Sequence, residues 1–153
     1  MKSDPLLTEG KLNELKNKLR RLKNISQPHA IEEVKRLAEL GDFSENVEYQ
    51  IAKGRLRGIN DNILKIENQL KHAVIITPQK QTAAVQVGHK VTALSDKKTK
   101  TYIILGSSET NPHKGIISRN SPIGAALIGH KVGEMVKIKI DNKEIAYKII
   151  RIE

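Results

Sequence analysis

Two carboxylates three residues apart, Asp42 and Glu45, follow directly on Gly41. The glycine predicts the end of one helix, and a second helix starting here would let both side chains face the same way. Mg²⁺ prefers oxygen ligands and is often held by one or two carboxylates plus water and phosphate. Two carboxylates alone make a poor metal site, so the pair suits a site completed by another molecule. The same spacing also fits an ordinary helix start, with Asp42 as the N-cap and Glu45 favoured by the helix dipole.

Other reactive chemistry is scarce in this sequence. There is no cysteine, which excludes disulfides, zinc ribbons and thiol catalysis. The five histidines lack metal-ligand spacing and are predicted to lie at the surface or in loops. Phosphate-binding loops and nucleophile elbows are absent too.

The residues on either side of the carboxylates predict two helices. Apolar side chains recur at gaps of three and four, which is typical of the narrow seam of a coiled coil. The seam residues before the carboxylates are Leu12, Leu15, Leu19, Leu22, Ile31, Val34 and Leu37, and those after are Leu56, Ile59, Ile63, Ile66 and Leu70. Two helices joined by one tight break predict an antiparallel hairpin over residues 1–76, with an acidic tip at 41–46.

Three residues disturb the hairpin pattern. Pro28 lacks a backbone donor and crowds the preceding turn, so the first helix should kink or restart near Gln27. Gly54 and Gly58 each cost roughly 1 kcal/mol relative to alanine inside the second helix. A helix from Thr8 to Leu40 would extend roughly 50 Å, so the hairpin either dimerises or reaches into a partner.

The second half of the chain has a different periodicity. Residues 77–84 are mostly polar, contain a proline and predict a linker. Residues 85–153 predict a small, mostly antiparallel sheet with one short helix, an α+β fold when combined with the hairpin. The strand candidates are 85–87, 101–105, 115–118, 136–140 and 145–152, with a turn at 141–143. Ser121 predicts the N-cap of the short helix, Pro122 its first turn and Gly129 its end.

The charge is unevenly distributed along the chain. Lys and Arg outnumber Asp and Glu by 14 to 11 in residues 1–76 and by 13 to 6 in residues 77–153. A basic surface can steer a protein toward nucleic acid or an acidic protein, or simply keep it soluble, and the charge alone leaves these readings open. The N-terminus lacks a signal peptide, and no apolar run is long enough to span a membrane, so a cytoplasmic protein is expected.

Two segments resemble a known family. The sequence Gly-Asp-Phe-Ser-Glu-Asn-Val-Glu-Tyr at 41–49 resembles the tip signature of the Gre transcript-cleavage factors. The segment Ile117–Gly129 resembles a second Gre motif, and the two motifs occur in the right order and at suitable spacing. The resemblance implies a coiled-coil N-terminal domain and an FKBP-like C-terminal domain. It also implies a monomer that enters the secondary channel of RNA polymerase and is not itself an enzyme.

The resemblance assigns roles to individual residues. Asp42 and Glu45 would help to hold a second Mg²⁺ at the polymerase active site, so that the 3′ end of backtracked nascent RNA is cleaved. Mg²⁺ would not bind tightly to the free protein. Phe43, Ser44 and Asn46 would shape the tip or contact the polymerase. Lys53 matches a basic family position that could meet RNA phosphates.

Further residues complete this interpretation. Arg55 and Arg57 could extend the basic patch, and Ser121, Pro122 and Ile123 would dock on the polymerase. Three positions depart from the family pattern: Ala38 replaces a frequent arginine, and Gly124 and Ala125 replace an alanine and a basic residue.

The alternatives are a channel-binding inhibitor of the polymerase, a peptidyl-prolyl isomerase and a plain nucleic-acid binder. The intact carboxylate pair argues against the inhibitor, whereas Ala38 leaves room for it. The isomerase follows only from the implied fold, which does not by itself carry a function.

Overall fold

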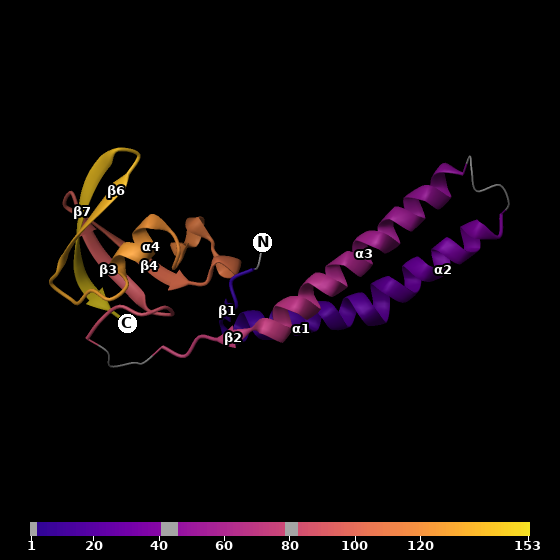
Figure 1. Ribbon diagram of the computed structural model, residues 1–153, viewed down its shortest axis with the longest axis horizontal. Helices are drawn as coiled ribbons and strands as arrows, with labels where there is room; N and C mark the ends of the chain where they lie inside the picture. The colour runs from indigo at the N-terminus through magenta and orange to yellow at the C-terminus, as the bar shows by residue number, and fades with distance from the viewer. Residues whose placement is uncertain (1–2, 41–45, 79–82) are drawn as a thin grey trace. The chain divides into compact units, whose positions relative to one another are not determined.

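The structure is a computed structural model that describes residues 3–40, 46–78 and 83–153. The chain divides into two compact units (Figure 1): Leu12–His72 form one, and Met1–Lys11 together with Ala73–Glu153 form the other. The predicted α+β fold class is confirmed, with a helical hairpin followed by a small sheet domain. The predicted boundary at residue 76 differs from this division, because the first eleven residues group with the second half of the chain.

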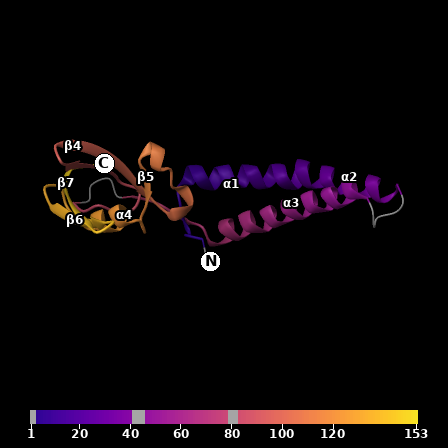
Figure 2. The same cartoon turned by 90° about the horizontal axis from the view of Figure 1, so that it is seen from above.

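The helical unit contains two arms that run side by side (Figures 1 and 2). The first arm joins α1 (Glu9–Arg21), the π-helical segment η1 (Leu22–Ser26) and α2 (Gln27–Ala38), and the second arm is α3 (Val47–His72). We call these two arms the hairpin arms. None of the described helices is sufficiently long and apolar to cross a membrane.

The restart predicted at Gln27 is confirmed. The backbone N–H of Gln27 donates to the carbonyl of Leu22, five residues back, and Pro28 lies in the first turn of α2, where its missing donor is harmless. The π turn places one extra residue in the helix and so rotates the buried face. As a result Ala30 is buried, whereas Ile31, which the sequence assigned to the seam, is 40% exposed.

Polar contacts join the two hairpin arms near the π-helical segment η1. The side-chain amide of Gln27 donates to Asn60 Oδ1 at 2.9 Å, and Lys23 forms an ion pair with Glu67. The predicted apolar seam is otherwise confirmed at its best-buried positions, Leu15, Leu37, Ile63 and Ile66.

The second unit is built on a five-stranded sheet of order β5-β4-β3-β7-β6. Its strands are β3 (Lys90–Ser95), β4 (Lys98–Leu105), β5 (Ile116–Ser118), β6 (Met135–Ile140) and β7 (Lys143–Ile152). All neighbouring pairs are antiparallel except β4 and β5, which makes the sheet mixed. Two short 3₁₀ turns, η2 (Ser107–Glu109) and η3 (Pro112–Lys114), lie between β4 and β5.

Both hairpins in the sheet use a two-residue turn in the left-handed conformation. Asp96 and Lys97 have φ values of 49° and 63°, and Asp141 and Asn142 have φ values of 49° and 64°. Turns with positive φ at both central residues match the right-handed twist of the flanking strands. One face of the sheet carries the apolar core, which α4 (Pro122–Leu127) helps to cover through the fully buried Leu127.

The strand predicted at 85–87 is wrong, and β3 was not predicted. Val85 is buried, but it exchanges backbone hydrogen bonds with Gly129 and His130, and a turn at Gly88 (φ +97°) ends the extended stretch. His89 lies in the loop just before β3, as predicted, but it is buried: its side chain is 3% exposed and accepts the Gln86 backbone N–H through Nδ1 at 2.9 Å.

A second, two-stranded sheet joins distant parts of the chain. Strand β1 (Leu6–Leu7) pairs in parallel with β2 (Val74–Ile75), so the segment before the first hairpin arm lies beside the segment after the second. Leu7 is 2% exposed and anchors this pairing in the second unit. The two chain connections to the helical unit therefore leave from adjacent strands.

Candidate functional site

The segment that carries the two carboxylates joins the end of α2 to the start of α3. Asp42, Phe43, Ser44 and Glu45 lie outside the described residues, so their predicted roles stay predictions. Asn46 is described, and its side-chain Oδ1 accepts the backbone N–H of Tyr49 at 3.1 Å. Asn46 is thus the N-cap of α3 and satisfies one of the donors that a helix start leaves without a partner.

The basic residues predicted to meet RNA do not form a single cluster. Lys53 lies over the ring of Tyr49, with Nζ 5.3 Å from the ring centroid, a cation–π distance. Arg55 instead donates to Glu33 Oε2 at 2.9 Å and so links the two hairpin arms. Arg57 lies one turn beyond Lys53 on the same helix face and is exposed. Lys53 and Arg57 can therefore serve a common ligand, whereas Arg55 is engaged with Glu33.

The predicted docking residues begin a well-formed helix. Ser121 Oγ donates to the carbonyl of Ser118 at 2.7 Å and accepts the Gly124 N–H at 3.0 Å, which confirms the predicted N-cap. A Cβ added to Gly124 would come within 2.1 Å of the Ser118 carbonyl oxygen. The glycine at this position therefore lets the turn close tightly against the helix. Pro122 and Ile123 lie in the first turn, with Pro122 exposed and Ile123 half-buried against the core.

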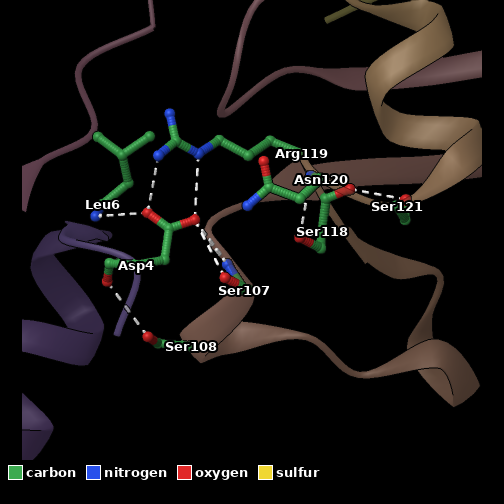
Figure 3. Close-up of polar contacts among 8 residues, drawn as sticks. All are labelled: Asp4, Leu6, Ser107, Ser108, Ser118, Arg119, Asn120 and Ser121. Carbon is green, nitrogen blue, oxygen red and sulfur yellow. Dashed lines mark hydrogen bonds and ion pairs between the residues drawn. The ribbon is translucent and has the colours of Figure 1, made fainter. Parts of the chain in front are cut away.

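Beside this turn lies an ion pair between distant parts of the chain (Figure 3). The guanidinium of Arg119 donates through Nε and Nη2 to the two carboxylate oxygens of Asp4, each at 3.1 Å. The backbone N–H groups of Leu6 and Ser107 donate to the same carboxylate at 3.1 and 3.0 Å. Only 2% of the Asp4 side chain is exposed, so this carboxylate is buried with its oxygens well hydrogen-bonded.

These contacts determine the ionisation of Asp4. Burial by itself would raise the pKa of the Asp4 carboxyl. The backbone donors of Ser107 and Leu6, followed by the Arg119 guanidinium, outweigh this effect and lower the pKa of Asp4 below its ordinary value. Asp4 is therefore ionised at neutral pH.

Two further contacts hold the same N-terminal segment. Thr8 donates through its backbone N–H and its hydroxyl to the carboxylate of Glu109, at 2.8 and 2.6 Å. A Cβ added to Gly106 would lie 2.4 Å from the carbonyl oxygen of Leu6, so only glycine allows the segment to pass so closely. We call residues 4–8, held in this way, the N-terminal clasp.

No pattern in the sequence pointed to a role for Asp4, Arg119, Thr8 or Glu109. Asp4 and Arg119 are 115 residues apart, and no local spacing links them. Among residues 3–40, 46–78 and 83–153 there is also no group of three or more His, Asp or Glu side chains that could hold a metal ion.

Comparison with known proteins covers both units. Residues 5–75 match the family described as transcription elongation factor, N-terminal, and residues 80–153 match the family described as transcription elongation factor, GreA/GreB, C-term. The chain belongs to the GreA/GreB family. Relatives of this GreA/GreB member can be aligned with it over nearly its whole length.

The transcription elongation factor GreA of Macrococcus caseolyticus is 38% identical over 99% of the chain and 97% of the relative. GreA of Limosilactobacillus fermentum is 37% identical over 99% and 98%. Among solved structures, the GreA factor homolog Gfh1 of Thermus thermophilus aligns over 98% of this chain and 99% of its own, with 22% identity and a TM-score of 0.45.

Proposed function

We propose that this GreA/GreB family member is a transcription elongation factor that enters the secondary channel of RNA polymerase. There it stimulates cleavage of the 3′ end of backtracked nascent RNA, which returns arrested complexes to synthesis. The catalytic activity belongs to the polymerase, and the factor supplies side chains to it. The observation that carries the proposal is the family match over both units in a chain that retains Asp42 and Glu45.

The described geometry is consistent with delivery of these carboxylates by the hairpin. The arms are antiparallel and joined by ion pairs at Glu33–Arg55 and Lys23–Glu67. The Asn46 cap fixes the start of α3 directly after Glu45. A supported helix start places side chains more precisely than an unstructured loop.

The donor set suits the metal that phosphodiester cleavage uses. Two carboxylates provide oxygen ligands of the kind Mg²⁺ prefers, while water and RNA phosphate can complete its coordination. A Mg²⁺ ion bound at the polymerase active site supplies an activated water and stabilises developing charge. Asp42 and Glu45 would orient that ion, and Lys53 and Arg57 would contact RNA phosphates.

A halted and backtracked RNA polymerase complex tests this proposal. Adding the protein should shorten the labelled RNA from its 3′ end. The polymerase should then resume extension of the shortened RNA. Asp42→Asn and Glu45→Gln should each slow cleavage strongly, because each neutral side chain is a weaker Mg²⁺ ligand. Glu39→Gln changes an exposed carboxylate just before the tip by the same chemistry and should cleave at the wild-type rate.

Three outcomes would count against the assignment. If Asp42→Asn and Glu45→Gln both cleaved RNA at the wild-type rate, the proposed role of these carboxylates in binding Mg²⁺ would be wrong. Stalled synthesis without RNA shortening would favour the channel-binding inhibitor. Equal losses in Glu39→Gln would indicate a general effect of charge near the tip.

A further inference from the structure

An open cavity of about 460 Å³ lies at the end of the five-stranded sheet where the β3–β4 hairpin turns. The side chains of Ala93, Ser95, Lys98, Lys100, Ile145 and Tyr147 line it, and we call it the basic trough. Ala93 pairs with Lys100 and Ser95 with Lys98 across β3 and β4. Because side chains alternate along a strand, these residues lie on the same face as the core residues Val91 and Tyr102.

The two sides of the basic trough differ in chemistry. On the β4 side, Lys98 and Lys100 are exposed, and within the described residues neither forms an ion pair. On the β7 side, Ile145 and Tyr147 present a wall that continues the apolar core. The acidic residue in the lining is Asp96, in the turn between β3 and β4.

Tyr147 forms the floor of the trough. Tyr147 is 7% exposed and lines the trough, and its side chain is hydrogen-bonded to Tyr102. Burial, followed by the charge and hydrogen bond of Tyr147, raises the pKa of Tyr102 above its ordinary value, so this phenol stays protonated.

A ligand of the trough must contact the lysines on one side and the apolar residues on the other. Nucleic acid binds single-strand sites through rows of cations and exposed aromatic faces for base stacking. The trough supplies two lysines and an almost buried tyrosine, so it has neither a row of cations nor an exposed aromatic face. A protein segment with carboxylates on one side and aliphatic side chains on the other is complementary to both the lysine wall and the apolar wall.

We propose that the basic trough is a docking site for an acidic, amphipathic segment of a protein partner. The carboxylates of that segment lie against Lys98 and Lys100, and its aliphatic side chains lie against Ile145 and Tyr147. This inference goes beyond transcript cleavage, since none of these residues takes part in the proposed delivery of the tip carboxylates. Its failure would leave the cleavage proposal intact.

The test uses the full chain and a fluorescent designed helix with glutamates on one face and leucines on the other. Wild-type protein should bind this peptide saturably in fluorescence anisotropy. Lys98→Glu combined with Lys100→Glu should weaken binding at least about tenfold, because attraction becomes repulsion within the site. The matched control combines Lys90→Glu with Lys148→Glu, two exposed lysines on the opposite face of the same sheet, and should stay within about twofold.

Two altered probes test the two halves of the proposal. Replacing the leucines of the peptide by serine should abolish binding, and replacing its glutamates by glutamine should do so as well. In amide NMR spectra of the wild-type chain, the peptide should shift the signals of residues 93–100 and 145–147 most.

The proposal is overturned if the wild-type chain does not bind the peptide or if both lysine pairs matter equally. It is also overturned if the serine peptide binds as well as the leucine peptide. Tighter binding of a single-stranded oligonucleotide that is lost in the Lys98/Lys100 variant would assign the trough to nucleic acid instead.

Discussion

Asp4 and Arg119 lie 115 residues apart in the chain and are joined by two hydrogen bonds of 3.1 Å. The pair attaches the start of the chain to the turn that precedes α4. Arg119 directly follows Ser118, whose carbonyl accepts the Ser121 hydroxyl in the predicted docking turn. The N-terminal clasp is therefore a structural part of the second unit.

Replacing Asp4 by asparagine should loosen the clasp. The amide keeps the size of the side chain but leaves the Arg119 charge without its partner, and losing one partner of a buried polar contact costs about 1–3 kcal/mol. Hydrogen exchange should speed up at the amides of Leu6 and Ser107, which donate to the carboxylate. The control Asp61→Asn, at an exposed position on α3, should leave these amides unchanged. Unchanged protection in Asp4→Asn would mean that the ion pair does not hold the segment.

The clasp should also weaken in acid. The pKa of Asp4 is held below its ordinary value of 3.8, so its contribution to stability is fully present above that pH. The contribution is lost as the pH falls through the lowered pKa of the folded state. Carboxyl ¹³C shifts should report an Asp4 pKa under 3.8, and Asp4→Asn should remove this acid-dependent loss of clasp protection. A measured pKa at or above 3.8 would contradict the described hydrogen bonds.

Two sets of glycines should respond oppositely to alanine. Gly54 and Gly58 are exposed in α3, and nothing lies within 4 Å of an added Cβ, so each alanine should stabilise the hairpin by about 1 kcal/mol. Gly106→Ala should instead destabilise the second unit by about 1–3 kcal/mol, because Leu6 O lies 2.4 Å from the added Cβ. Thermal unfolding followed by circular dichroism would measure both. A stabilising Gly106→Ala would show that the clasp does not pass close to β4.

Asn46 offers a way to separate helix capping from polymerase contact. Asn46→Ala should lower helix stability by about 1 kcal/mol, whereas Asn46→Ser should keep the cap to within a few tenths. If Asn46 acts only as the cap, Asn46→Ser should retain transcript cleavage and Asn46→Ala should lose part of it. Equal loss in both variants, with the Ser variant still folded, would indicate a direct contact of the amide with the polymerase.

The local features of the fold could be predicted from the sequence. Helical periodicity predicted the hairpin arms, Pro28 the restart at Gln27, and the Ser121–Pro122 pair the start of α4. Alternation over residues 136–140 and 145–152 predicted most of β6 and β7, because their core-facing residues are large and aliphatic.

Features that depend on small residues or distant partners escaped prediction. In β3 the buried positions are Val91 and Ala93 beside Thr92, a pattern too weak to stand out. The prediction that Ile31 belongs to the seam was wrong because the π turn rotates the buried face of the helix, and no residue type predicts such a turn. The Asp4–Arg119 pair has no local signature at all, and the roles of the tip carboxylates stay predictions, since the first five residues of their motif lie outside the described ones.

The parallel pairing of β1 with β2 has a consequence for the order of folding on the ribosome. Leu6 and Leu7 are made before their strand partners, residues 74 and 75, and the carboxylate of Asp4 waits still longer for Arg119. At about 5–20 residues per second, synthesis of the intervening 115 residues takes on the order of 5–20 s. The hairpin arms end at His72, directly before β2, so β1 can pair with β2 well before Arg119 is available to Asp4. The carboxylate of Asp4 thus reaches its native contact later than the strand that follows it.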